Sequence, residues 1–152
     1  MANEISDRDS ILLREGMNHS WNWFALHAGQ RMQAVNFFLV TIGFLTSAYS
    51  FALNADRPEV AAVIGLIGGL VTFYFRRLEV RTKELVKAGE AALKASEAIL
   101  AKHSGTDSFE IASIVEEPGE RFSSYGQVIF ALQATVFLAF VSGLIYAVVE
   151  AA

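Results

Sequence analysis

The sequence predicts an all-α integral membrane protein with three transmembrane helices, an N-terminal amphipathic helix and a long cytoplasmic extension of the second span. Hydrophobic residues make up 53% of the 152 residues, and the mean hydropathy of +0.38 is above that of a typical soluble chain. Charged residues are absent from three windows, Met32–Ala55, Val60–Phe75 and Phe122–Val149. A bilayer core needs about 20 residues of helix. The first and third windows therefore qualify outright, and the second qualifies with Pro58 and Arg76 at the interfaces.

Residues 1–34 predict an N-terminal amphipathic helix at the membrane interface. Apolar side chains recur there at spacings of three and four, which places them on one helical face. Trp21 and Trp23 are of the type that lies at lipid headgroups, and the aliphatic stem of Arg31 allows its charge to reach the surface. These three residues are the expected interfacial anchors, whether the helix lies on the membrane or packs on cytoplasmic helices. The apolar face consists of Leu13, Met17, Trp21, Phe24, Ala28 and Met32.

Residues 35–54 predict the first transmembrane span, in which small and polar side chains form a stripe. Asn36, Gly43, Ser47 and Ser50 follow one another at spacings of seven, four and three, and face away from the phenylalanines of the same span. In lipid, helices associate through small residues and side-chain hydrogen bonds. The polar stripe formed by these four residues therefore either packs against another helix or lines a polar path.

Residues 58–75 predict the second span, joined to the first by a short outer loop. Pro58 suits the first turn of a helix, because the N–H group that it lacks has no helical partner there. Gly65 and Gly69 form a GxxxG spacing, which brings two helix backbones together in an apolar segment. The spacing predicts tight packing without identifying the partner helix.

Residues 76–102 predict a cytoplasmic helix continuous with the second span, because no proline interrupts the transition and the basic segment favours helix. Leu78, Leu85, Ala92 and Ile99 repeat every seven residues, which is the spacing of a coiled-coil seam. Such a helix requires neighbours, from its own chain or from other copies. We expect these four residues to form an oligomer seam.

Residues 103–124 are the expected cytoplasmic loop, and residues 125–150 the third span. Gln127 and Gln133 in that span either bond to a neighbouring helix or face a polar path. The segment between the second and third spans carries eight Lys and Arg residues, against three in the N-terminal region and one in the outer loop. The positive-inside rule therefore predicts a bacterial cytoplasmic (inner) membrane protein with its N-terminus in the cytoplasm and its C-terminus outside.

The sequence shows no constellation of catalytic groups, so we do not expect an enzyme. It has no cysteine, no charged residue within a span, no phosphate-binding loop and no nucleophile elbow. His19 and His27 are eight residues apart, whereas zinc-binding histidines on a helix lie one turn apart, which favours packing over metal binding. Arg14 and His19 match the R-x4-H spacing of a ribonuclease family, but this pattern consists of only two residues and is weak evidence for an enzyme. We expect no metal or other cofactor, no cleavable signal peptide, and, at a net charge of −4, no direct nucleic-acid partner.

Two stretches of the chain resemble a known family. They are HAGQRMQAVNFFLVTIGFLTSAYSF, residues 27–51, and GLVTFYFRRLEVRTKELVKAGEAALK, residues 69–94. They are similar to the RipA-like small bacterial membrane proteins, which are described as octameric and share a Gln/Arg-rich turn, an Asn-Phe-Phe-Leu span, a second span and a basic helix. Similar membrane proteins accompany some RNA-targeting CRISPR effectors and act as pores in phage defence. The resemblance covers about half of the chain and implies a pore; the third span and the cluster at 21–23 depart from its pattern.

The lipid bilayer is an expected partner of this protein, and two functional hypotheses follow. In one, copies of the chain form a homo-oligomer that encloses a central pore or cavity, as an effector in stress or phage defence. In the other, the protein is a non-conducting scaffold or signalling subunit whose cytoplasmic helices bind a soluble partner. The polar stripe and the self-associating basic helix favour the first.

Overall fold

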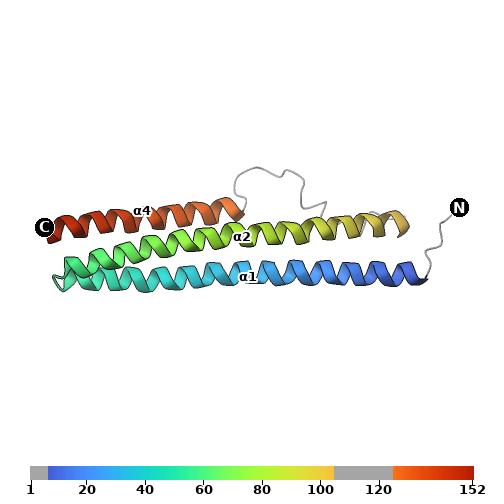
Figure 1. The fold of residues 1–152 in the computed structure, drawn as a ribbon, viewed down its shortest axis with the longest axis horizontal. Helices are drawn as coiled ribbons and strands as arrows, with labels where there is room; N and C mark the ends of the chain where they lie inside the picture. Colours follow the sequence, from blue (N-terminus) through green and yellow to red (C-terminus); the bar gives the residue numbers. More distant parts are fainter. Residues whose placement is uncertain (1–6, 105–124) are drawn as a thin grey trace. The chain divides into compact units, whose positions relative to one another are not determined.

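The computed structural model describes residues 7–104 and 125–152 as three helices joined by one short turn. Helix α1 is Asp7–Asn54, α2 is Pro58–Ser104 and α4 is Tyr125–Ala151 (Figure 1). All three are long and apolar enough to cross a membrane. The predicted all-helical class with three long apolar helices is therefore confirmed. The expected cytoplasmic loop lies, from residue 105 to residue 124, outside the described residues.

Helix α1 differs from the expectation of two separate segments. The sequence predicted an interfacial helix over 1–34 and a span over 35–54, whereas one uninterrupted helix passes through both. The residues at the expected junction, 30–34, contain neither proline nor glycine and are good helix formers, so nothing ends the helix there. Helix α2 likewise runs without a break through residues 75 and 76.

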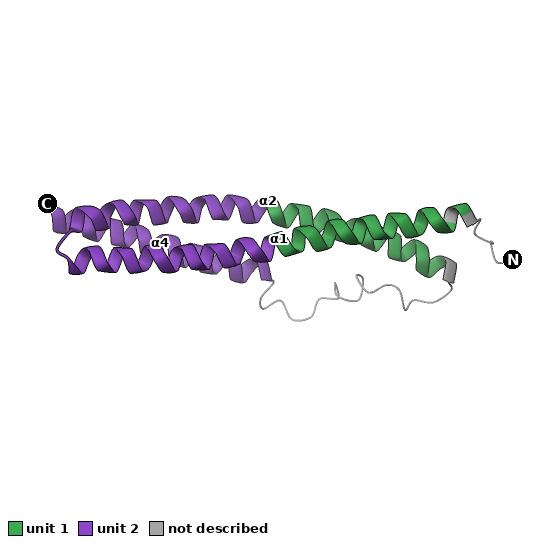
Figure 2. Cartoon of the chain, turned by 90° about the horizontal axis from the view of Figure 1, so that it is seen from below, with its two compact units in different colours: residues 1–30, 82–121 green, residues 31–81, 122–152 purple. Residues whose placement is uncertain are grey.

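The chain divides into two compact units, coloured separately in Figure 2. The described part of the first unit consists of residues 7–30 and 82–104, and that of the second of residues 31–81 and 125–152. The first unit is thus a pair of helical segments, and the second contains segments of all three helices.

A three-residue turn closes the hairpin between α1 and α2 in the second unit. Asp56 has a positive φ of 54°, its N–H donates to the Leu53 carbonyl at 3.1 Å, and the N–H of Arg57 donates to the Ala52 carbonyl at 3.0 Å. These are the two hydrogen bonds of the Schellman motif that ends many helices. Pro58 then begins α2 at the position where its missing N–H costs nothing. The turn therefore sets the register in which the two helices pair.

Small residues form the core of the second unit near this turn. Ala52, Ala61 and Ala147, one from each helix, are buried together. Small side chains allow backbones to approach closely, which is how helices associate in lipid. Farther from the turn, the buried Phe38 of α1 packs against Phe75 of α2 with ring centroids 5.4 Å apart. Within this unit α2 is therefore antiparallel to both α1 and α4, as the ribbon also shows (Figure 1).

In the first unit, α1 and α2 approach each other closely at Gly89. A Cβ atom on Gly89 would lie 3.1 Å from the Cα of Phe24 and 3.0 Å from Cδ1 of Trp23. The indole N–H of Trp23 donates to the carbonyl of Leu85 at 3.3 Å. Trp23 is therefore an anchor between two helices, and its indole N–H bonds to protein.

Candidate functional site

A largely buried ion pair joins α1 and α2 next to the charge-free windows. Nη2 of Arg31 lies 2.6 Å from Oε1 of Glu79, and Nε donates to Oε2 at 3.1 Å, so the pair is bidentate. The two side chains are only 14% and 6% exposed. The hydrogen bond with Glu79 raises the pKa of Arg31, so the guanidinium stays charged at any working pH. Bidentate arginine–carboxylate pairs are strong and directional, and this one fixes α1 against α2.

Helix α4 joins this pair through its first residue. The guanidinium carbon of Arg31 lies 5.2 Å from the centre of the Tyr125 ring, within the range of a cation–π contact. The Tyr125 hydroxyl donates to Sδ of Met32 at 2.7 Å. We call Arg31, Met32, Glu79 and Tyr125 the Arg31 junction. It is the place where a charged group contacts all three helices of the second unit.

Arg31 was expected to anchor the chain at the membrane surface, and the structure in addition pairs its charge with Glu79. The sequence does contain a signal for this contact. Arg31 and Glu79 each lie 24 residues from Ala55 in the turn, so an antiparallel hairpin closed there places them opposite each other. The register of the hairpin, rather than the charge pattern alone, would have identified the pair.

The polar stripe of α1 is exposed along its length. Asn36, Gly43, Ser47 and Ser50 are all exposed, and a Cβ atom on Gly43 would meet nothing within 4 Å. The Ser47 hydroxyl donates to the Gly43 carbonyl of its own helix at 2.9 Å. The stripe is therefore not buried by any other helix of the described chain.

The stripe lies on the side of α1 opposite its packing face. Three of its residues each precede an inward-facing residue by two positions: Asn36 precedes Phe38, Ser47 precedes Tyr49, and Ser50 precedes Ala52. Two positions turn a helix by about 200°. Phe37, Phe44 and Phe51 form a separate exposed face between the two, and Phe44 is 74% exposed.

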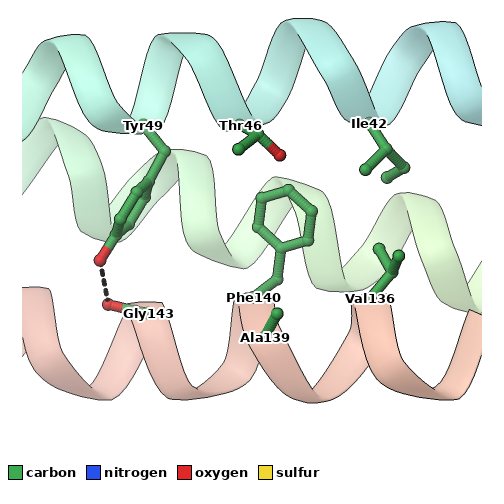
Figure 3. Close-up of a pocket in the computed structure, with 7 residues that line it drawn as sticks. All are labelled: Ile42, Thr46, Tyr49, Val136, Ala139, Phe140 and Gly143. Carbon is green, nitrogen blue, oxygen red and sulfur yellow. Dashed lines mark hydrogen bonds between the residues drawn. The ribbon is translucent and has the colours of Figure 1, made fainter.

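A groove of about 230 Å³ lies between α1 and α4 (Figure 3). Tyr49 of α1 reaches across it, and its hydroxyl donates to the Gly143 carbonyl of α4 at 2.8 Å. The other side chains drawn in Figure 3 are mostly apolar. The groove therefore offers packing surface and no reactive group.

The two glutamines of α4 lie in different surroundings. Gln133 is 5% exposed and lies beside Thr72 of α2, whereas Gln127 is exposed. Gln133 thus lies between α2 and α4 of one chain, but no described residue bonds to its Oε1, so both roles expected for it stay predictions. Gln127 lies at the surface of α4.

The glycines of α2 pack against α4 of the same chain. A Cβ atom on Gly65 would lie 3.1 Å from the Cα of Leu144, and one on Gly68 would overlap the ring of Phe140. At Gly69 the nearest atom, Cε2 of Phe137, would be 3.9 Å away, an ordinary contact. The close approach therefore depends on Gly65 and Gly68, three residues apart, more than on the GxxxG pair.

We expect Gly65→Ala to lower the thermal stability of the detergent-purified protein relative to Gly69→Ala. Both changes gain the same helix propensity, but only the first forces the α4 backbone at Leu144 to move, and overpacking costs about 1 to 3 kcal/mol. Melting followed by circular dichroism in one detergent measures the difference. Equal melting temperatures for the two variants would contradict the close packing of α2 on α4.

The predicted seam of α2 lies beside the face that packs on α1. The buried residues between Leu78 and Ile99 are Glu79, Thr82, Gly89 and Leu93, and Leu85 is half-buried. The remaining seam residues, Leu78, Ala92 and Ile99, are exposed. Three of the four seam residues thus lie on the surface of α2, whereas Leu85 borders its contact with α1 at Trp23.

The aromatic and histidine residues of α1 pack locally. His27 lies edge-on to Trp23 with ring centroids 4.6 Å apart, and its Nδ1 is 3.0 Å from Oε1 of Gln30. Trp21 is exposed and lies 6.0 Å from the ring of Phe24. In residues 7–104 and 125–152 there is no group of three or more His, Asp or Glu side chains that could hold a metal ion.

Comparison with known proteins finds a similar protein, which matches over part of its length. No protein-family model matches the chain, and no solved structure matches it, so the likeness to RipA-like membrane proteins stays a prediction. CD-NTase-associated protein 19 from Escherichia coli is 32% identical over 78 residues. The match covers 50% of this chain and 52% of the relative, so the chain spans about half the length of the curated relative it matches. The chain is therefore similar to part of a CD-NTase-associated protein and carries three helices able to cross a membrane.

Proposed function

We propose that copies of this chain assemble in a membrane around the polar stripe of α1 and enclose a pore or cavity. The exposed stripe carries this proposal, because it lies opposite the face of α1 that packs on α2 and α4. Polar groups in transmembrane segments face a bundle interior or a water-filled cavity, since contact with lipid tails is costly. An oligomer supplies such an interior where a single chain does not.

The length of the stripe supports a path through the membrane. From Asn36 to Ser50 a helix rises about 21 Å at 1.5 Å per residue, which is most of a hydrocarbon core of about 30 Å. Gly43 lies near the middle of the stripe and leaves room beside the helix. Small groups at the centre and an amide at one end are compatible with a narrow aqueous path.

The relative suggests the biological setting. Its name says that it is associated with a CD-NTase. We propose that this chain is a membrane effector of a bacterial phage-defence system, in the inner membrane with its N-terminus in the cytoplasm. Activation would then open the path and collapse the gradients of an infected cell.

Single cysteines test the pore directly, because the sequence contains none. Asn36→Cys, Gly43→Cys, Ser47→Cys and Ser50→Cys are each expressed, and intact membranes are treated with a charged, water-soluble thiol reagent. We expect labelling at all four positions, and we expect the reagent to reduce ion flux in proteoliposomes. The matched controls are Phe37→Cys and Phe44→Cys, which lie in the same turns on a face outside the stripe and should label much more slowly.

The labelling pattern also separates the second candidate function, a non-conducting scaffold that binds a soluble partner. The exposed apolar side chains Ile11, Leu12 and Leu26 in the first unit favour such a partner. A scaffold predicts stripe cysteines that cross-link between copies, resist the water-soluble reagent and leave liposomes impermeable. If the stripe neither labels nor cross-links, both the path and the assembly around it are wrong.

A further inference from the structure

A second groove, of about 220 Å³, lies between α2 and α4 in the second unit. Phe73 and Phe137 line it with apolar surface, and Arg76 and Gln133 are its charged and amide groups. Arg76 follows the last residue of the charge-free window of α2. With α2 in a membrane, the groove therefore begins at headgroup level and continues among the lipid tails.

The charge of Arg76 is held at the groove without an acidic partner. Its guanidinium carbon lies 4.7 Å from the centre of the Phe130 ring, a cation–π contact that fixes the side chain over α4. Among the residues that the structure describes, Arg76 has no carboxylate within salt-bridge distance, and Glu79 of the same unit is paired with Arg31. An anion at this position would complement the charge.

Gln133 supplies a second, independent sign of a missing ligand. The side chain is 5% exposed, and its Oε1 is buried with no hydrogen-bond partner among the described residues. The neighbouring Thr72 hydroxyl does not serve it, because that hydroxyl donates to the Gly68 carbonyl at 2.8 Å. Buried amides are normally paired, and an amide can turn its donor or its acceptor end toward a partner.

We propose that this groove binds one anionic phospholipid. Its phosphate pairs with Arg76, and an acyl chain lies against Phe73 and Phe137. About one turn deeper, the Gln133 amide turns its N–H groups toward the groove in place of Oε1 and donates to an ester carbonyl of the lipid. Basic pockets between transmembrane helices on the cytoplasmic side bind acidic lipid headgroups by the same charge complementarity. The proposal rests on the membrane insertion of the proposed function but not on a pore.

Native mass spectrometry of the intact, delipidated chain in detergent tests this site. The protein is titrated with phosphatidylglycerol and with phosphatidylcholine of identical acyl chains. We expect preferential retention of phosphatidylglycerol, and a loss of about tenfold in its affinity in Arg76→Gln, because a charge-assisted bond to phosphate is removed. The matched control is Arg77→Gln, which removes the same charge from the next, exposed residue and should bind like the wild type.

Ala134→Leu provides a second variant that leaves the charge unchanged. Ala134 lines the groove, so a larger side chain fills the place of the acyl chain and should weaken phosphatidylglycerol binding severalfold. Equal retention of the two lipids by the wild type, equal losses in Arg76→Gln and Arg77→Gln, or wild-type binding by Ala134→Leu would each overturn the site. Because lipid retention is measured without ion flux, failure of the pore and failure of the lipid site give separate results.

Discussion

Replacing Glu79 with leucine is expected to destabilise the protein by about 3 kcal/mol, because it leaves the charge of Arg31 buried without a partner. The carboxylate accepts two hydrogen bonds from Arg31 and is 6% exposed, so water does not replace it. Arg31→Met should cost a similar amount for the converse reason. Unfolding of detergent-purified protein in a denaturant series, followed by circular dichroism, measures both losses.

The double variant Arg31→Met/Glu79→Leu shows whether the stability losses of the two single variants arise from unpaired charges. It removes both charges and keeps apolar volume, and such replacements of buried pairs are often close to neutral. We therefore expect it to be more stable than either single variant. The control Glu90→Leu removes a carboxylate from an exposed position of α2 and should change stability by no more than about 0.5 kcal/mol. A double variant that loses the sum of the single losses would show that the two charges do not depend on each other.

Aspartate in the polar stripe is expected to be tolerated, whereas aspartate three residues away is not. Phe44→Asp places a charge on the exposed phenylalanine face, where a carboxylate in the middle of a span costs about 2.5 to 3.5 kcal/mol of insertion free energy. Ser47→Asp places the same charge in the proposed aqueous path, where it stays hydrated. We expect the amount of Phe44→Asp protein in the carbonate-resistant membrane fraction to be severalfold lower than that of the wild type. We expect Ser47→Asp to insert like the wild type.

The inserted Ser47→Asp protein should also change what passes through the membrane. A ring of carboxylates, one from each copy, attracts cations and repels anions in a narrow path. The reversal potential across a salt gradient in planar bilayers should therefore move toward the cation equilibrium potential. Insertion of Ser47→Asp as poor as that of Phe44→Asp would mean that the stripe lies in a dry environment.

Much of the helical organisation can be predicted from local properties of the sequence. The charge-free windows predict apolar segments long enough to cross a bilayer, and the structure has three such helices. The sequence predicted two separate segments that meet near residues 30–34, whereas α1 is continuous there. No helix-breaking residue is present at these positions to end the helix. Windows of hydropathy locate apolar stretches, but they do not locate helix ends that lie in polar sequence.

The partners of individual side chains could not be predicted in the same way. A spacing of three or four residues defines a face of a helix, and says nothing about what that face contacts. Gly65 was expected to pack against a helix, and the structure supplies Leu144 of α4 as its neighbour. Arg31 was expected as an interfacial anchor, and the register of the hairpin adds a partner, Glu79, that this expectation did not include.

The sequence by itself determined that this protein has apolar helices with a polar stripe, because charge, hydropathy and helical period are local properties. Only the tertiary structure decided that Asn36, Gly43, Ser47 and Ser50 face away from α2 and α4, since the rotation of α1 depends on the turn at Asp56 and on which side chains fit together. That rotation leaves polar groups on the outside of a single chain. It is the physical reason to expect further copies around them.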